Sequence, residues 1–491
     1  MTELKQLSGQ DNSFLEIEKL GLPQHIASVA IYDQSTAPGG IVRFKQILAH
    51  LESRLHLSPI FRTKLHPAPF DLDRPYVVDD EQFDLEYHVR HIALPQPGDW
   101  RQLCILIARI NARALDLSRP LWELYVIEGL DKIAQVPPGS FALLLKVHHC
   151  VMDGASAVEM LSAIHDFGSE SRQIDPERQR VIRIPPTGIE LGARAYMNAL
   201  RKPRRFYNLA RKMIGAQAQL RKRAEDDGER APAAERKVLT RFNEEISPHR
   251  VLDSVTLDFA ELRAIKNTLP GATINDVMLA IVSGALRKYL ESEGELPRAS
   301  LTCGCPIDVR DPSERGTGGN VIGFMGVLLR TDIADPARRL RAVHEAAVDA
   351  KAEARASDVR IPREVMDTVP SGILTTAMRV QGFFGINATP FNTMLTNVPG
   401  TSTDLYFAGA QSIEGFGIGP LVPGVALFHT ASSVVVNKRG RMLLSFWACR
   451  RALPNPDTYR ACILDSYNEL RDATLGTESS EASDETTEPE D

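Results

Sequence analysis

Apolar residues form two kinds of pattern along the first half of the chain. Some stretches alternate or run continuously, as in a buried strand, and others have the three-to-four spacing of a helix. Each strand-like stretch is short, and helix-like stretches separate some of them. Strands are predicted over residues 26–32, 83–92, 121–127 and 141–147, and helices over residues 44–55 and 100–114. The order predicts an α/β fold with mixed sheet connections rather than strict β-α-β winding.

The second half of the chain repeats this style, so two similar α/β halves are expected. Strands are predicted over residues 251–257, 301–307, 321–329, 393–396 and 431–436, and helices over residues 259–267, 274–290 and 338–352. Thr273 is a good N-cap for the helix at 274–290, and Asp276 falls in its first turn, where a negative charge is favourable.

Between the halves, apolar residues become sparse and basic residues gather. One interpretation is a solvated helical linker, and the other is an amphipathic element that rests on anionic lipid. The polar stretch 224–234 is predicted to be flexible and to join the two domains, and the acidic end of the chain is expected to be disordered. The predicted parts are an N-terminal domain (1–168), a basic and largely helical linker (169–240), a C-terminal domain (241–476) and an acidic tail (477–491).

Composition narrows the class of protein. The 491 residues are 43% hydrophobic and 24% charged, as in a globular protein, and the net charge of −6 predicts no nucleic-acid partner. The six cysteines lack the spacing of a disulfide framework, which favours a reduced, cytoplasmic compartment, and no metal site is expected at Cys303 and Cys305. No signal peptide or spanning helix is expected, so membrane contact would be peripheral.

The stretch 141–164 holds the strongest candidate chemistry. A buried strand runs into His148 and His149, and Asp153 and Gly154 precede an apolar helix pattern. Imidazole suits proton transfer near neutral pH, although a histidine pair at a strand end also occurs as a purely structural pair. Adjacent residues of a strand point to opposite faces, so one site would use only one ring. The spacing does not match a helical metal motif.

The segment HHCVMDG fits HHxxxDG, the signature of the CoA-dependent acyltransferase and condensation-domain superfamily. Other blocks follow in the order of one branch, so the chain resembles the bacterial wax ester synthase/diacylglycerol acyltransferases from about residue 7 to residue 475. These blocks are FDLEYH (83–88), LDLSRPLWE (115–123), RFNEEISPHR (241–250), Asn275-Asp276 and NVPG (397–400).

The resemblance implies two chloramphenicol-acetyltransferase-like domains with mixed sheets, joined by a helical linker around a central tunnel. It assigns His149 as the general base and His148 as a supporting residue. Asp153 would form a structural ion pair, with Arg62 as first and Arg310 as second candidate partner. Gly154 would let the chain turn tightly near substrate. Asn275, Asp276 and Trp122 are the candidate substrate-binding residues, although Asn275 could equally bond its own helix start and Trp122 could be a wall residue.

The expected activity is O-acyl transfer from acyl-CoA, a substrate rather than a cofactor, to diacylglycerol, to a long-chain alcohol, or to both. Two alternatives stay open: a condensation-type enzyme with a carrier-bound donor, and a non-catalytic protein that coats lipid droplets. We expect no cofactor and a monomer or homodimer. We also expect a cytoplasmic protein that associates peripherally with the membrane or with lipid inclusions.

Overall fold

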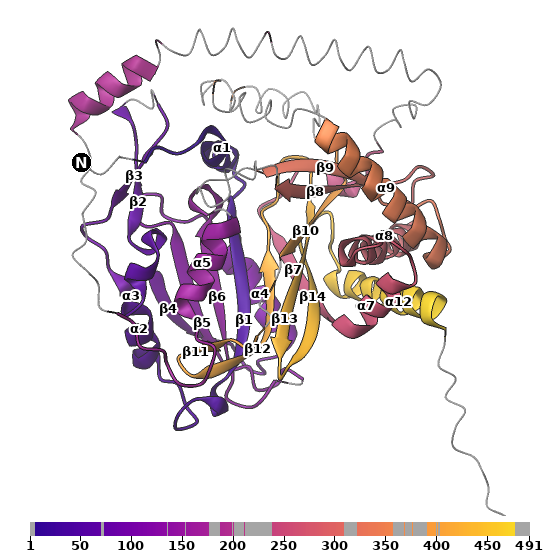
Figure 1. Ribbon diagram of the computed structural model, residues 1–491, viewed down its shortest axis with the longest axis horizontal. Helices are drawn as coiled ribbons and strands as arrows, with labels where there is room; N and C mark the ends of the chain where they lie inside the picture. The colour runs from indigo at the N-terminus through magenta and orange to yellow at the C-terminus, as the bar shows by residue number, and fades with distance from the viewer. Residues whose placement is uncertain are drawn as a thin grey trace, which may run out of the picture.

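The computed structural model of the 491-residue chain describes two mixed α/β halves that share a core (Figure 1). The description covers residues 5–69, 73–134, 136–152, 154–175, 187–198, 200, 211, 238–308, 322–356, 368, 376, 390–398, 400 and 403–476. Most of the basic linker, the acidic tail, Asp153 and Arg310 therefore lie outside the described residues.

The elements of the first half surround one sheet. In chain order they are α1 (Gly9–Glu18), β1 (His25–Asp33), η1 (Gln34–Thr36), α2 (Phe44–Glu52), η2 (Leu55–Leu57), η3 (Pro59–Phe61), β2 (Thr63–His66), β3 (Tyr76–Asp79), α3 (Leu85–His88), β4 (Val89–Ala93), α4 (Trp100–Asn111), β5 (Trp122–Glu128), β6 (Phe141–His148), η5 (His149–Val151) and α5 (Gly154–Ile164).

The second half forms another sheet with helices packed on it. Its elements are η6 (Arg241–Asn243), β7 (Arg250–Asp258), α7 (Phe259–Asn267), α8 (Ile274–Ser292), β8 (Thr302–Asp308), β9 (Ile322–Leu328), α9 (Pro336–Ala356), β10 (Thr393–Val398), β11 (Tyr406–Phe407), β12 (Ala410–Ile418), β13 (Leu427–Val436), β14 (Arg439–Cys449) and α12 (Pro456–Leu475).

The first sheet takes two of its six strands from the second half. Its order is β11-β12-β1-β6-β5-β4, and β12 pairs antiparallel with β1 from Ala27–Ile418 to Asp33–Gln411. β6 lies between β1 and β5 and is antiparallel to both, whereas β4 and β5 are parallel. Residues 406–418 therefore complete the N-terminal sheet, and the two halves are connected by main-chain hydrogen bonds.

The second sheet has the order β7-β14-β13-β10-β8-β9 and is also mixed, because β10 is parallel to both β13 and β8. α7, α8, α9 and α12 pack together beside it (Figure 1). Among the described residues, no helix is both long enough and apolar enough to cross a lipid bilayer. The predicted α/β fold with two halves and mixed sheets is confirmed.

Every residue of β6 is buried, and its side chains alternate between two cores. Leu143 and Leu145 pack in the outer core with α2 and α5, whereas Ala142 and Leu144 pack in the core shared with the second half. By the same alternation, Lys146 and His148 belong to the face that carries Ala142 and Leu144. The strand therefore directs two polar side chains toward the junction of the halves.

Most of the predicted elements are observed with small changes at their ends, including β1, α4, β5, β6, β7, α7, α8 and α9. The prediction of one strand over residues 83–92 is wrong. The Asp84 side chain accepts a hydrogen bond from the backbone N–H of Glu86 and so caps the short helix α3, and only then does β4 begin. The elements α1, β12, β14 and α12 were not predicted.

Candidate functional site

The histidine pair lies where β6 ends. The backbone N–H of His148 donates to Leu121 O (3.0 Å), and that of His149 donates to Gln24 O (2.9 Å). The strand stops at His148, and His149 begins the 3₁₀ turn η5. Strand alternation therefore does not govern His149, and the expectation of two opposite faces is wrong. Both rings contact α1, through Glu18 and Phe14, which lie four residues apart on that helix.

His148 is fully buried and its tautomer follows from its neighbours. The backbone N–H of Cys150 donates to Nδ1 (3.1 Å), so the proton of a neutral ring must be on Nε2. Nε2 lies 3.3 Å from a carboxylate oxygen of Glu18, a contact longer than an ideal hydrogen bond. Burial alone would raise the pKa of Glu18, but His148, the Gln24 N–H and Lys146 together lower it. His148 is thus held in place by one backbone donor and one carboxylate.

His149 is only partly buried, so a substrate group can reach it. Its ring stacks on Phe14 with centroids 4.1 Å apart and an interplanar angle of 14°. Burial, with a smaller contribution from His148, lowers the pKa of His149 to about 4. The imidazole is therefore neutral at physiological pH and able to accept a proton. The stacking contact with Phe14 fixes the plane of the ring, and part of the side chain stays exposed.

Gln24 connects the backbone of His149 to the second half of the protein. Its side chain is fully buried, and Nε2 donates to Leu421 O (2.9 Å) and to Leu22 O (3.0 Å). Its own carbonyl accepts the N–H of His149, and its N–H donates to Glu18 (2.9 Å). A shift of residue 421 relative to the first half would therefore move Gln24 and, through it, the backbone of His149.

A second group of buried polar side chains contacts the C-terminal end of α4. Lys146 is fully buried and donates to Ile110 O (3.2 Å) and Arg113 O (2.8 Å), with Glu123 at 3.5 Å. Nε2 of His25, the register partner of His148, donates to Asn111 O (2.5 Å). Positive and N–H-bearing groups at this end of the helix offset its partial negative charge. These contacts fix α4 against β6.

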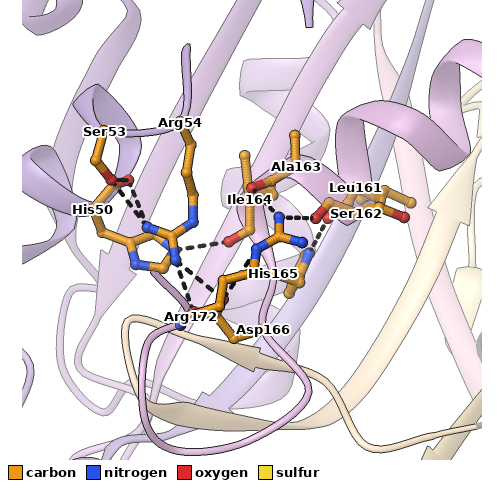
Figure 2. A network of polar contacts seen from close by, with 10 residues as sticks. All are labelled: His50, Ser53, Arg54, Leu161, Ser162, Ala163, Ile164, His165, Asp166 and Arg172. Atoms are coloured by element: carbon orange, nitrogen blue, oxygen red, sulfur yellow. Dashed lines mark hydrogen bonds and ion pairs between the residues drawn. The ribbon is translucent and has the colours of Figure 1, made fainter. Parts of the chain in front are cut away.

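The helix α5, which follows the histidine pair, is anchored at its far end by a buried ion pair (Figure 2). Nη2 of Arg54 donates to both carboxylate oxygens of Asp166 (3.1 and 2.9 Å), and the two side chains are 3% and 2% exposed. Arg172 approaches Asp166 at 3.5 Å and donates to Ser162 O and Ala163 O, carbonyls of the last turn. Asp166 joins the two arginines of this network, which the sequence did not predict.

The predicted ion pair of Asp153 cannot be followed, because Asp153 and Arg310 lie outside the described residues. Arg62 follows the turn η3, and its carbonyl accepts the N–H of Asp80 (2.8 Å). The neighbouring Phe61 packs in the same core cluster as Met152. Gly154 begins α5. The pairing of Asp153 with Arg62, or with Arg310, stays a prediction.

The predicted substrate-binding residues have structural contacts. Asp276 forms a capping box with Thr273, and the same carboxylate lies 2.9 Å from Nδ1 of His344. Trp122 is 1% exposed, donates to Phe61 O (3.0 Å) and stacks on His88. Asn275 is partly exposed in the first turn of α8. Substrate binding by these residues stays a prediction, and for Asp276 and Trp122 the contacts favour a structural role.

Steric contacts explain the glycine at position 400 of the NVPG segment. A Cβ atom at Gly400 would overlap the backbone oxygen of Ser433, so no other residue fits without a main-chain shift. Within the part of the chain that the structure describes, no cluster of three or more His, Cys, Asp or Glu side chains could hold a metal ion.

Phe14, Glu18 and Gln24 are the contacts of the histidine pair that sequence reasoning missed. All three belong to or follow α1, which has a polar sequence without a clear apolar stripe. Two signals could have located the helix. Ser8 and Asp11 stand at the spacing of a capping pair, and Ser8 Oγ accepts the Asp11 N–H (3.0 Å). Phe14 and Glu18 have the i, i+4 spacing of one helix face.

Comparison of folds first defines the class. The structure aligns over 95% of its length with 98% of the wax ester synthase/diacylglycerol acyltransferase from Marinobacter aquaeolei VT8, with a TM-score of 0.67 and 24% identity. It also aligns over 96% of its length with 97% of the first condensation domain of the CDA synthetase, with a TM-score of 0.55 and 13% identity. The chain has the two-domain fold shared by these acyltransferases and condensation domains.

Sequence comparison then defines the family. Residues 7–278 match the wax ester synthase/diacylglycerol acyltransferase catalytic domain, and residues 318–471 match the C-terminal domain of that family. Rv1760 of Mycobacterium tuberculosis H37Rv, which carries the name diacylglycerol O-acyltransferase, is 32% identical over 458 residues, 92% of this chain and 87% of that protein. The chain belongs to the wax ester synthase/diacylglycerol acyltransferase family and is an acyltransferase. The predicted family is confirmed.

Proposed function

We propose that the protein transfers a long-chain acyl group from acyl-CoA to the hydroxyl of diacylglycerol or of a long-chain alcohol, with His149 as the general base. The observation that carries this proposal is the neutral, partly exposed imidazole of His149 in the turn that follows β6, in a chain of this family. Family membership supports the acyl transfer, and the position of His149 supports its role.

The chemistry needs one group that both takes and returns a proton. His149 would accept the hydroxyl proton as the alcohol oxygen attacks the thioester carbonyl carbon. The tetrahedral intermediate would then break its C–S bond, and the imidazolium would protonate the departing CoA thiolate. A thioester is already electrophilic, so this route needs no covalent enzyme intermediate. General base catalysis contributes about 10²- to 10⁴-fold to the rate, and positioning of the two substrates adds to it.

We also propose that the protein works at a lipid surface, because of the nature of its acceptors. Diacylglycerol and long-chain alcohols partition into membranes or lipid inclusions rather than water, so the enzyme must meet them there. Peripheral association would be sufficient. The basic residues of the linker, the candidate membrane contact, lie outside the described residues.

The test is release of free CoA from palmitoyl-CoA by the purified full-length protein, with dioleoylglycerol and hexadecanol offered separately. Acceptor-dependent release with either alcohol supports the proposal, ranks the two acceptors and excludes a lipid-coating protein without activity. Folded protein that releases no CoA with either acceptor overturns it. Transfer from palmitoyl-pantetheine on a carrier protein, but not from palmitoyl-CoA, would establish the condensation-type alternative instead.

A further inference from the structure

A cavity of about 660 Å³ lies between the two halves, against α4 and the start of β7. We call it the arginine groove, because five arginines line it. Arg101, Arg109 and Arg113 come from α4 and the turn after it, and Arg250 and Arg450 come from the second half. His249 also lines it. The backbone N–H of Arg450 donates to His249 O (3.0 Å), which brings the two segments of the second half together.

The groove carries a strong positive charge without internal compensation. Of the lining residues that the structure describes, none is Asp or Glu. The nearest recorded carboxylate contact is that of Arg101 with Asp457, at 3.9 Å between two exposed side chains, and such pairs contribute little. Burial lowers the pKa of Arg250, whose guanidinium donates to the carbonyls of Ser247 and His249. Like charges converge here at a cost that a bound anion would offset.

The helix dipole does not account for this arrangement. Arg109 and Arg113 lie near the C-terminal end of α4, where positive charge is favourable in any protein. Arg101 lies in the first turn, where positive charge is unfavourable. Arg250 and Arg450 belong to another part of the chain. What the five arginines share is that they line the same cavity.

The groove adjoins the structure that holds the histidine pair. It shares Ala112 and Arg250 with a smaller cavity of about 10 Å³, which is also lined by His25 and Leu421. His25 is the register partner of His148, and Gln24 joins Leu421 O to the backbone of His149. The smaller cavity has room for about one water molecule. The groove is therefore next to a smaller cavity whose wall includes His25, the strand neighbour of His148.

We propose that the arginine groove binds the phosphates of the nucleotide end of acyl-CoA. This inference rests on the proposed function, which supplies the donor. Coenzyme A carries a diphosphate and a 3′-phosphate, and arginine binds such groups through paired hydrogen bonds. A volume of about 660 Å³ is in the range of small-ligand sites. A phosphate-bearing lipid headgroup has the same recognition chemistry, so the experiment must separate the two.

The test measures acyl transfer from two thioester donors, in full-length wild type and in the double variant Arg109→Gln with Arg450→Gln. Palmitoyl-CoA carries the nucleotide, and S-palmitoyl-N-acetylcysteamine lacks it. Both arginines are exposed, so the variant should fold, which its melting temperature checks. We expect the ratio of kcat/KM for palmitoyl-CoA to kcat/KM for the short thioester to fall about tenfold. Arg439→Gln, an exposed arginine at the opposite end of β14, is the matched control and should leave the ratio unchanged.

An unchanged ratio in the double variant would overturn the inference. If that variant has also lost binding to phosphatidylglycerol vesicles, the groove is a site for lipid headgroups instead. If wild-type protein uses neither thioester, the proposed function fails, and the groove is then tested by calorimetric binding of free CoA. The inference about the groove is supported if the double variant binds CoA about tenfold more weakly and wild type binds 3′-dephospho-CoA more weakly than CoA. Equal binding of CoA by both proteins overturns the inference.

Discussion

Glu18 lies 3.3 Å from Nε2 of His148, and this contact ties α1 to the end of β6. Because Nδ1 of His148 accepts the Cys150 N–H, only Nε2 of the neutral ring can carry the proton that faces the carboxylate. Glu18 also accepts the N–H of Gln24, whose carbonyl binds the His149 N–H. One carboxylate thus positions His148 directly and the backbone of His149 indirectly.

We expect Glu18→Gln to lower the free energy of unfolding by about 1–3 kcal/mol at neutral pH, since it removes a largely buried charge that faces His148 and accepts the Gln24 N–H. The pKa of Glu18 is lowered in the folded protein. Its stabilisation is therefore present above the ordinary carboxyl pKa and is lost as the pH falls through the folded value. Denaturant titrations should show wild type and variant converging in acid. Glu52→Gln, at the exposed end of α2, is the control, and a pH-independent difference would contradict the charge-based explanation.

Replacing the base tests the mechanism. We expect His149→Ala to reduce kcat about 10²- to 10⁴-fold, since the hydroxyl would lose its proton acceptor. The melting temperature should change little, because the ring is partly exposed and its recorded ring contact is Phe14. His66→Ala, on the hairpin strand β2, is a matched histidine control with expected wild-type rates. Activity of His149→Ala within a factor of about three of wild type would refute the assignment.

The pH dependence of the reaction should reflect the pKa of His149, which burial lowers to about 4. A base with that pKa stays neutral, and therefore active, as the pH falls from neutrality to about 5. We expect kcat/KM to stay level over that interval and to decline only near pH 4, because protonation then removes the base. The profile should be measured with acyl-CoA below KM. An acidic limb near the ordinary imidazole pKa, about 6.5, would show that burial does not control this ring.

The Arg54–Asp166 pair should be important for stability. Asp166→Asn would leave the Arg54 guanidinium buried without its counter-charge, and we expect a loss of about 3–5 kcal/mol in the free energy of unfolding. Asp332→Asn breaks the more exposed pair with Arg330, at 3.3 Å, and should cost less than about 1 kcal/mol. Chemical denaturation of both variants gives the comparison. Equal losses would mean that burial does not set the contribution of the Asp166 pair.

The fold was largely predictable because its strands are continuously apolar and its helices have regular spacing, as in β6 and α8. β12 was missed because Gly415 and Gly417 interrupt its apolar pattern. α1 was missed because its buried side chains are mostly polar, including Gln10, Asp11 and Asn12. Propensity and periodicity detect burial of apolar groups, and they do not detect polar groups that other parts of the chain satisfy.

The same limit applies to the candidate site. The HHxxxDG spelling located His148 and His149 in one short segment. Their contacts Glu18 and Phe14 are more than a hundred residues earlier, and the arginine groove joins α4 to residues near 250 and 450. Such neighbours depend on how the sheets associate, which no local pattern specifies.

The insertion of β12 into the first sheet constrains how the protein can be made and how it can evolve. During synthesis, β1 has β6 on one side as soon as residue 148 emerges, but its other edge waits for residues 410–418. An open strand edge of that kind invites wrong partners, so the nascent chain must protect it for most of its translation. Either half expressed alone would lack one partner of this pairing, and the first half would expose an edge of β1.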